Sequence, residues 1–263
     1  NQACLDNVFA GKLTSCLVNP RACHETELLI EPTATPIRIA VVGAGPAGMA
    51  CAATAAERGH EVTLFDAAAV IGGQFNLARR IPGKEEFNET LRYFGHRLKN
   101  AGVTLRLGQR VEAGELAQAG FEHIVLATGI IPRTLDIPGN EHAKVVSYID
   151  LIEGRKTAGA RVAIIGAGGI GFDVGEFLTH ADDAKSELER FQAEWGIDAT
   201  LAARGGLMRP EKETPPRQVW LLQRKATKVG DGLAKTTGWI RRSLLKMRGV
   251  HMLAGVSYER IDD

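Results

Sequence analysis

Two glycine-rich segments have the residue types and spacing that most directly indicate chemistry in this chain. Each follows a short apolar run: Ile37–Val42 precedes Gly-Ala-Gly-Pro-Ala-Gly at 43–48, and Arg161–Ile165 precedes Gly-Ala-Gly-Gly-Ile-Gly at 166–171. In a strand–turn–helix unit the first glycine permits the tight turn, the second admits a pyrophosphate, and the third allows close helix packing. A phosphate then lies at the helix N-terminus, where unpaired N–H groups favour an anion. The residues predicted to contact dinucleotides are Gly43, Gly45, Pro46, Ala47 and Gly48, then Gly166, Gly168 and Gly171.

The residue that ends the next strand distinguishes the two predicted sites. After the first segment, the run 61–66 ends in Asp66, whose carboxylate can accept hydrogen bonds from a ribose. After the second, the run 218–223 is followed by Arg224 and Lys225. A carboxylate there would repel a 2′-phosphate, whereas Arg can bind it with two hydrogen bonds and Lys adds a positive charge. We therefore expect the second site to prefer NADPH, the alternative being an ordinary solvated basic pair.

Two further segments resemble those of flavoprotein reductases that bind two dinucleotides. An apolar run that begins at His123 ends in Ala-Thr-Gly at 127–129, which makes Thr128 and Gly129 candidates for cofactor contact. In the Gly-Gly-Gln at 72–74, Gly73 and Gln74 fit the segment that lies along the flavin in that class. Two dinucleotide sites in one chain indicate that NADPH is the donor and FAD the first acceptor.

Three cysteines lie in the N-terminal 36 residues, at positions 4, 16 and 23. By themselves they indicate metal binding only weakly, and a cytosolic setting argues against structural disulfides. Cys51, within the helix expected after the first glycine segment, is interpreted as a small core residue. The histidines have no partner acid at a motif spacing and are interpreted as surface or core residues, and no catalytic residue is predicted.

The N-terminal segment resembles a family motif. Cys4, preceded by Asn-Gln-Ala, and Cys16, followed by Leu-Val-Asn-Pro, are similar to the end of the Cys-x2-Cys-x3-Cys-x11-Cys motif of bacterial 2,4-dienoyl-CoA reductases and their trimethylamine dehydrogenase relatives. Segments 11–16, 81–87, 194–198 and 232–239 extend the resemblance. It implies that Cys4 and Cys16 are two thiolate ligands of a [4Fe–4S] cluster, that Gln2 lies near the flavin, and that Cys23 is structural. Two free thiols are the alternative for Cys4 and Cys16.

The same resemblance implies a function. In that family an N-terminal (β/α)8 barrel holds FMN and the substrate, and electrons pass from NADPH through FAD and the cluster to FMN, for reduction of a 2,4-dienoyl-CoA in fatty acid β-oxidation. The first residue is Asn1 and the last, Asp263, closely follows a strand-like run, so we expect a piece of a longer protein that is inactive alone. The alternatives are an NADH:flavin oxidoreductase, an amine dehydrogenase with a vestigial second nucleotide domain, and an electron-transfer module for a separate catalytic partner.

These residues require an α/β fold with two Rossmann-like dinucleotide-binding domains of the disulfide-reductase type, the NADPH domain being inserted in the FAD domain. We expect a partial iron–sulfur segment at 1–36, the first part of the FAD domain at 37–150 and a truncated NADPH domain at 151–263, with helices over 49–58 and 172–180. A net charge of +1 gives no field that favours nucleic acid, and no apolar run is long enough to span a membrane. A cytoplasmic protein is expected.

Overall fold

The computed structural model describes residues 2–181 and 185–262, and its contacts divide the chain into two compact units. The first unit, which carries the first glycine segment, comprises His24–Arg80 and Lys84–Thr134. The second unit comprises Asn1–Cys23, Ile81–Gly83 and Leu135–Asp263. The predicted domains 1–36, 37–150 and 151–263 are defined by the cofactor that each is expected to bind, so their boundaries stay predictions.

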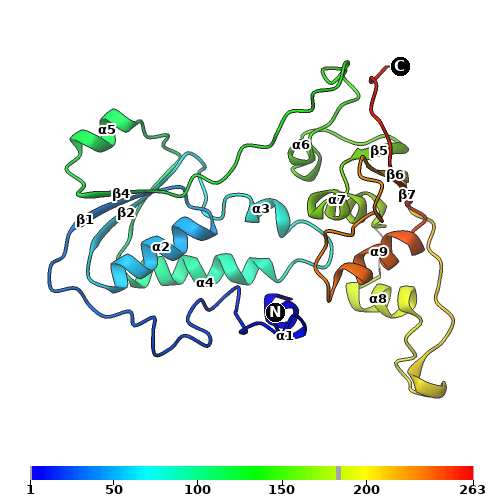
Figure 1. The fold of residues 1–263 in the computed structure, drawn as a ribbon, viewed down its shortest axis with the longest axis horizontal. Coiled ribbons are helices and arrows are strands. Elements are labelled where there is room, and N and C mark those ends of the chain that lie inside the picture. Colours follow the sequence, from blue (N-terminus) through cyan, green and yellow to red (C-terminus); the bar gives the residue numbers. More distant parts are fainter. Residues whose placement is uncertain (1, 182–184, 263) are drawn as a thin grey trace. The chain divides into compact units, whose positions relative to one another are not determined.

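Strands and helices alternate along most of the chain (Figure 1). In chain order they are α1 (Gln2–Phe9), β1 (Arg38–Val42), α2 (Pro46–Glu57), β2 (Glu61–Asp66), α3 (Phe75–Ala78), α4 (Phe87–Asn100), β3 (Thr104–Leu107), α5 (Ala113–Gln118), β4 (His123–Leu126), α6 (Tyr148–Ile152), β5 (Arg161–Ile165), α7 (Gly169–Thr179), α8 (Glu187–Trp195), the 3₁₀ turn η1 (Arg204–Gly206), β6 (Gln218–Gln223), α9 (Gly238–Met247) and β7 (His251–Ala254).

The first unit is built on a parallel sheet of strand order β3-β2-β1-β4. Side chains alternate across β1, as they do in any strand. Ile39 and Val41 pack with α2 and α4 on one face, while Ala40 faces the other side, with Leu116 of α5. Figure 1 shows α2 and α4 on one side of this sheet and α5 on the other. The core therefore holds the carboxyl end of β1 in place, where the first glycine segment begins.

The second unit repeats the arrangement with three parallel strands, in the order β5-β6-β7. Val219 and Leu221 of β6 are buried, on the side where α7 contacts β6. Trp220 points to the opposite face, where the Arg161 guanidinium lies 5.4 Å from its ring centroid and the His251 ring stacks on it at 5.3 Å.

The expected α/β fold class with Rossmann-like parallel sheets is confirmed. The predicted strands at 61–66, 161–165 and 218–223 are found with those bounds, and the apolar run that begins at His123 forms β4, which ends at Leu126, before the Ala-Thr-Gly. Helices α2 and α7 begin earlier than expected, at Pro46 and Gly169, because each starts directly at the glycine turn. Residues 2–9 of the predicted iron–sulfur segment form α1, a helix that the sequence did not indicate. No helix among the described residues is long and apolar enough to cross a bilayer.

Candidate dinucleotide-binding sites

In the first glycine turn, the three motif glycines have different surroundings. Gly43 has φ +108°, and a Cβ there would lie 2.3 Å from the Ala127 carbonyl oxygen. A Cβ at Gly48 would lie 1.7 Å from the Gly43 carbonyl oxygen, whereas one at Gly45 would meet nothing within 4 Å. The first and third glycines therefore permit close backbone packing, and the second faces open space, as a pyrophosphate site requires.

The helices that follow the two glycine turns differ in capping from two other helices of the chain. In α6 and α8, the side chains of Ser147 and Ser186 accept hydrogen bonds from backbone N–H groups. Helices α2 and α7 begin after Gly45 and Gly168 without a side-chain cap. Their first N–H groups have no partner within the helix, so they are donors for an anion such as a phosphate.

Two other predicted segments of the first unit lie beside its glycine turn. The Gly72 N–H donates to the Ala44 carbonyl at 2.8 Å, and a Cβ on Gly73 would lie 3.1 Å from the Gly45 Cα. The Gln74 side-chain amide donates to the Ile130 carbonyl at 3.3 Å, which joins the 72–74 segment to the one that follows β4. The structure therefore brings the glycine turn, Gly73–Gln74 and the segment that follows β4, which carries Thr128 and Gly129, next to one another.

Asp66 is bonded to the turn itself, which the sequence did not reveal. One carboxylate oxygen accepts from the Ala44 N–H at 2.6 Å, and the other accepts from the Ala68 N–H at 2.7 Å. A carboxylate offers about four acceptor positions. Asp66 therefore supports the glycine turn and retains acceptors for the two hydroxyls of a ribose.

The second glycine turn has the same construction. Gly166 has φ +113°, and its N–H donates to Leu222 at 3.0 Å. A Cβ at Gly171 would lie 2.0 Å from the Gly166 carbonyl oxygen, and one at Gly168 would meet nothing within 4 Å. A Cβ at Gly166 also meets open space, because the described part of this unit has no strand on the free side of β5.

The strand registers show which residues of the two units are equivalent. The last residue of β1 pairs with Phe65, and the last residue of β5 pairs with Leu222. Gln223 is thus the counterpart of Asp66, and Arg224 and Lys225 are the counterparts of two alanines at 67 and 68.

Hydrogen bonds to the neighbouring strand support this equivalence. The Gly108 N–H donates to Ala68 at 2.8 Å, and the Gly255 N–H donates to Lys225 at 3.0 Å. The side chains of Arg224 and Lys225 are exposed at the carboxyl end of β6 and make no ion pair with any described carboxylate. Two cations therefore occupy positions that are uncharged in the first unit.

The predicted metal ligands lie in the second unit. Cys4 is half-buried in α1, and the Cys16 sulfur accepts a hydrogen bond from the Asn19 N–H at 3.3 Å. Backbone hydrogen bonds from Asn19 and then Val18 lower the pKa of the Cys16 thiol, which favours the thiolate that a metal requires. Gln2 begins α1, and its side chain lies outside the described part of the chain. Among the described residues, no three His, Cys, Asp or Glu side chains converge as a complete metal site.

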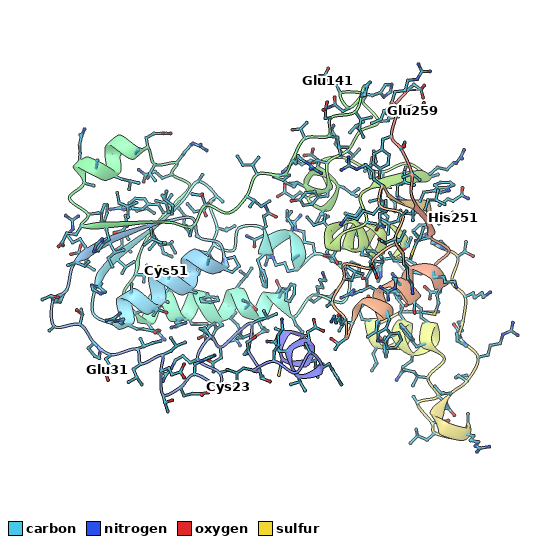
Figure 2. All side chains as sticks on the ribbon, viewed as in Figure 1. Cys23, Glu31, Cys51, Glu141, His251 and Glu259 are labelled. Carbon is cyan, nitrogen blue, oxygen red and sulfur yellow. The ribbon has the colours of Figure 1, made fainter. Side chains whose placement is uncertain are left out.

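Figure 2 labels the other two cysteines, Cys23 and Cys51. Cys51, in α2, packs against the core of the first unit, and burial raises the pKa of its thiol. Cys23 is exposed, with φ +64°.

The carboxylate of Asp6 connects α1 to the loop before α9. One of its oxygens accepts from both the backbone N–H and the hydroxyl of Thr236, at 3.1 and 2.6 Å. Both residues belong to the second unit. The helix that carries Cys4 is therefore attached to the nucleotide fold by a contact between residues 230 positions apart.

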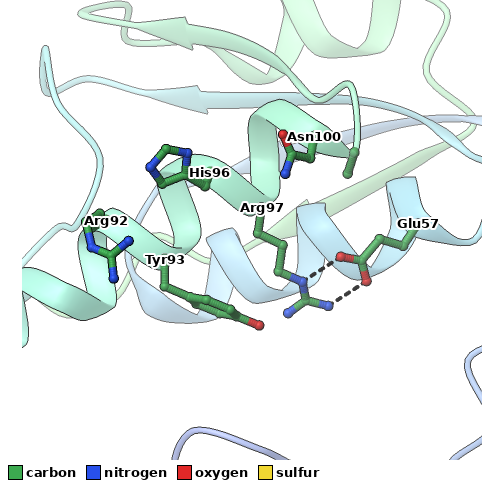
Figure 3. Close-up of a pocket in the computed structure, with 7 residues that line it drawn as sticks. Glu57, Arg92, Tyr93, His96, Arg97 and Asn100 are labelled. Atoms are coloured by element: carbon green, nitrogen blue, oxygen red, sulfur yellow. Dashed lines mark hydrogen bonds and ion pairs between the residues drawn. The ribbon is translucent and has the colours of Figure 1, made fainter.

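Figure 3 shows an open pocket of the first unit. It is lined mainly by α4 residues, among them Tyr93 and His96, and Arg97 pairs with Glu57 there at 2.6 Å. Glu57 ends the helix that begins at Pro46, so it lies about 16 Å along the helix from the turn. The ion pair joins α2 to α4 and lies too far away to contact a pyrophosphate at the turn.

Buried charged and titratable groups that the sequence did not predict lie where α8 packs against the ends of α7 and α9. Glu194 of α8 receives two hydrogen bonds from Arg248, at 2.6 and 3.0 Å, with both side chains buried. Burial is the main cause that lowers the pKa of His180, whose Nδ1 is buried without a hydrogen-bond partner among the described residues. These groups pack α8 onto the second unit and lie outside the glycine turn.

Known proteins resemble this chain over most of its length. Residues 37–263 match the family Pyridine nucleotide-disulphide oxidoreductase. A metal reductase of Desulforamulus reducens is 37% identical over 73% of this chain and 29% of its own length. An N,N-dimethylglycine/sarcosine dehydrogenase of Chromohalobacter salexigens is 37% identical over 61% of this chain and 25% of its own length. The structure of a 2-naphthoyl-CoA reductase in complex with 2-naphthoyl-CoA aligns with all of this chain and 35% of its own, at a TM-score of 0.81 and 26% identity.

The chain belongs to the pyridine nucleotide-disulphide oxidoreductase family. This membership implies binding of FAD and a nicotinamide nucleotide and a role in flavin-dependent electron transfer. The chain spans about a third or less of the length of these relatives.

Proposed function

We propose that this chain is the electron-input part of an NADPH-dependent reductase of 2,4-dienoyl-CoA thioesters. In this proposal the first unit binds FAD, the second binds NADPH, and Cys4 and Cys16 supply part of the ligand set of a [4Fe–4S] cluster. Reduction of the substrate takes place at FMN in a part of the protein outside this chain. FAD, when bound, supplies an acceptor of two electrons that can release them one at a time.

One observation carries the nucleotide assignment: equivalent positions of the two units differ in charge. Asp66 accepts hydrogen bonds, as ribose recognition requires, whereas its counterpart Gln223 is neutral and is followed by Arg224 and Lys225. Because both strands end at the same edge as their glycine turns, these side chains lie where the adenosine ribose of a bound dinucleotide is expected. A 2′-phosphate would meet two cations in the second unit and an acid in the first.

The cofactors fit the residues present. Gly45 and Gly168 leave open space at uncapped helix N-termini, which suits a pyrophosphate in each unit. The N–H···S bond to Cys16 favours a thiolate, as cluster ligation requires. The likeness to a 2-naphthoyl-CoA reductase supports a CoA thioester as the substrate class.

A second candidate is an amine dehydrogenase, favoured by the 37% identity to an N,N-dimethylglycine/sarcosine dehydrogenase. In that function the second nucleotide site is vestigial. The intact turn of Gly166, Gly168 and Gly171, together with Arg224 and Lys225, argues for a working site. An electron-transfer module acting on a separate partner would use the same two sites.

The test is anaerobic reduction of the flavin in the full-length protein by NADPH and, in parallel, by NADH, followed by turnover with a 2,4-dienoyl-CoA. Fast turnover with NADPH and slow turnover with NADH is the expected result. An Arg224→Ala/Lys225→Ala variant should lose this preference while retaining reduction by NADH.

Other outcomes lead to different conclusions. Flavin reduction without turnover would contradict the dienoyl-CoA assignment, and other enones and amines would then be the substrates to test. Absence of flavin reduction by either nucleotide would refute a working second site and favour the amine dehydrogenase.

A further inference from the structure

Gln223 differs from its counterpart Asp66 in the direction of its hydrogen bonds. Asp66 accepts from the glycine turn and from the N–H two residues ahead. Gln223 donates: its side-chain nitrogen lies 3.0 Å from the Lys225 carbonyl oxygen and 2.9 Å from the Thr227 carbonyl oxygen. The amide NH₂ has two hydrogens, so both carbonyls can be satisfied at once.

These two bonds shape the loop that carries the cations. Because the Gln223 amide donates to the carbonyls of both Lys225 and Thr227, the backbone turns back on itself after β6. The Lys225 carbonyl is also fixed by the Gly255 N–H at 3.0 Å, and the Gln223 carbonyl accepts from the Val256 N–H at 3.2 Å. With the carbonyls turned toward the amide and β7, the side chains of the loop remain exposed.

We infer that Gln223 is a positioning residue for nucleotide selectivity: its side-chain amide holds the 224–227 loop so that Arg224 and Lys225 are presented to the 2′-phosphate of NADPH. This inference rests on the proposed preference for NADPH. Gln223 need not contact the phosphate. Its contribution is the preformed loop, since a loop ordered before binding loses less conformational entropy when the phosphate arrives.

The comparison of Gln223 with its counterpart Asp66 explains why a glutamine suits this position. A carboxylate here would place negative charge beside the 2′-phosphate and would be unable to donate to the two carbonyls. An apolar side chain of similar length would remove the donors without adding charge. Gln223→Met and Gln223→Glu therefore separate the loss of loop order from the addition of charge.

The experiment measures dissociation constants of the full-length protein for 2′,5′-ADP and 5′-AMP by calorimetry, with melting temperature as a check on folding. The first probe carries the 2′-phosphate and the second lacks it. Gln223→Met should weaken 2′,5′-ADP about tenfold and leave 5′-AMP unchanged, as expected for the loss of two ordinary hydrogen bonds that affect only the phosphate-binding loop. Gln223→Glu should weaken 2′,5′-ADP further.

Thr227→Val is the matched control. It removes the hydroxyl, which lies 3.4 Å from the amide, and keeps the carbonyl that accepts the hydrogen bond. It should behave as the wild type. Arg224→Ala/Lys225→Ala tests the proposed function separately, by removing the cations themselves.

The outcomes distinguish the two ideas. If the double variant retains the wild-type preference for 2′,5′-ADP, the NADPH assignment fails and the inference fails with it. If the double variant loses the preference but Gln223→Met keeps it, the positioning role alone is refuted. Equal weakening of both ligands by Gln223→Met would also refute it, because the residue would then support the fold as a whole.

Discussion

Gly48 and Gly45 belong to one motif, yet the structure predicts opposite consequences for the same substitution. Gly48→Ala adds a methyl group whose carbon would lie 1.7 Å from the Gly43 carbonyl oxygen and 3.3 Å from the Ala127 side chain. Gly45→Ala adds the same methyl group at a position with φ −71° and ψ 178°, where it meets nothing within 4 Å. The first change should affect folding and the second cofactor binding.

The magnitude follows from the contact. To reach a separation of 3.0 Å, the start of α2 must move by about 1.3 Å from the turn, and both atoms involved belong to rigid backbone or to Cβ. Such overpacking lowers the free energy of unfolding by about 3 kcal/mol, and the higher helix propensity of Ala offsets about 1 kcal/mol of this loss. We expect Gly48→Ala to lower the free energy of unfolding by about 2 kcal/mol. Gly45→Ala should change it by only about 0.5 kcal/mol, because its backbone conformation is accessible to Ala.

The assay is urea unfolding of the FAD-free protein, followed by circular dichroism, together with flavin content after reconstitution. Removing FAD first keeps ligand stabilisation out of the comparison. Gly45→Ala should unfold like the wild type and retain little flavin. Equal stability of Gly48→Ala and wild type, or equal destabilisation by the two variants, would refute the division of roles. Gly171 and Gly168 should repeat the contrast in the second unit.

Three further predictions concern the second unit. Glu194→Gln should lower the free energy of unfolding by about 3 kcal/mol, because it removes the carboxylate that is hydrogen-bonded to the buried Arg248 guanidinium, and Glu194→Leu/Arg248→Met should recover most of the loss. His180 should make stability fall as the pH drops below 6.5, because burial lowers its pKa in the folded protein and the unfolded chain binds the proton first; His180→Asn should reduce this slope in melting curves. Asp6→Ala should cost about 1–2 kcal/mol and expose α1 to proteolysis, since it removes both hydrogen bonds from Thr236.

Specific results would contradict each of them. A double variant no more stable than Glu194→Gln would show that lost packing, and not the loss of the carboxylate bonded to Arg248, causes the destabilisation. An unchanged acid slope in His180→Asn would assign the pH dependence to other groups. Equal protease resistance of Asp6→Ala and wild type would mean that apolar contacts alone hold α1.

The sequence alone determined the features that depend on local chemistry. Apolar runs of five or six residues predicted β2, β5 and β6 with their observed bounds, because strand patterning is set by neighbouring residues. A glycine turn directly after the run also marks the end of β5. The sequence also predicted the glycine segments as dinucleotide sites and singled out Arg224 and Lys225. The assignment of these particular residues to FAD and NADPH stays a prediction, as does the assignment of Cys4 and Cys16 as cluster ligands.

Only the tertiary structure decided the features that depend on contacts between distant residues. Helix α1 has eight residues, too few to be stable alone, and it is attached through Thr236 far along the chain. The division of labour between Gly45 and Gly48 follows from which atoms lie beside each, and the equivalence of Gln223 to Asp66 follows from strand register. Sequence spacing fixes which residues are near in the chain, whereas packing and register fix which are near in space, and the chemistry of a site depends on the second.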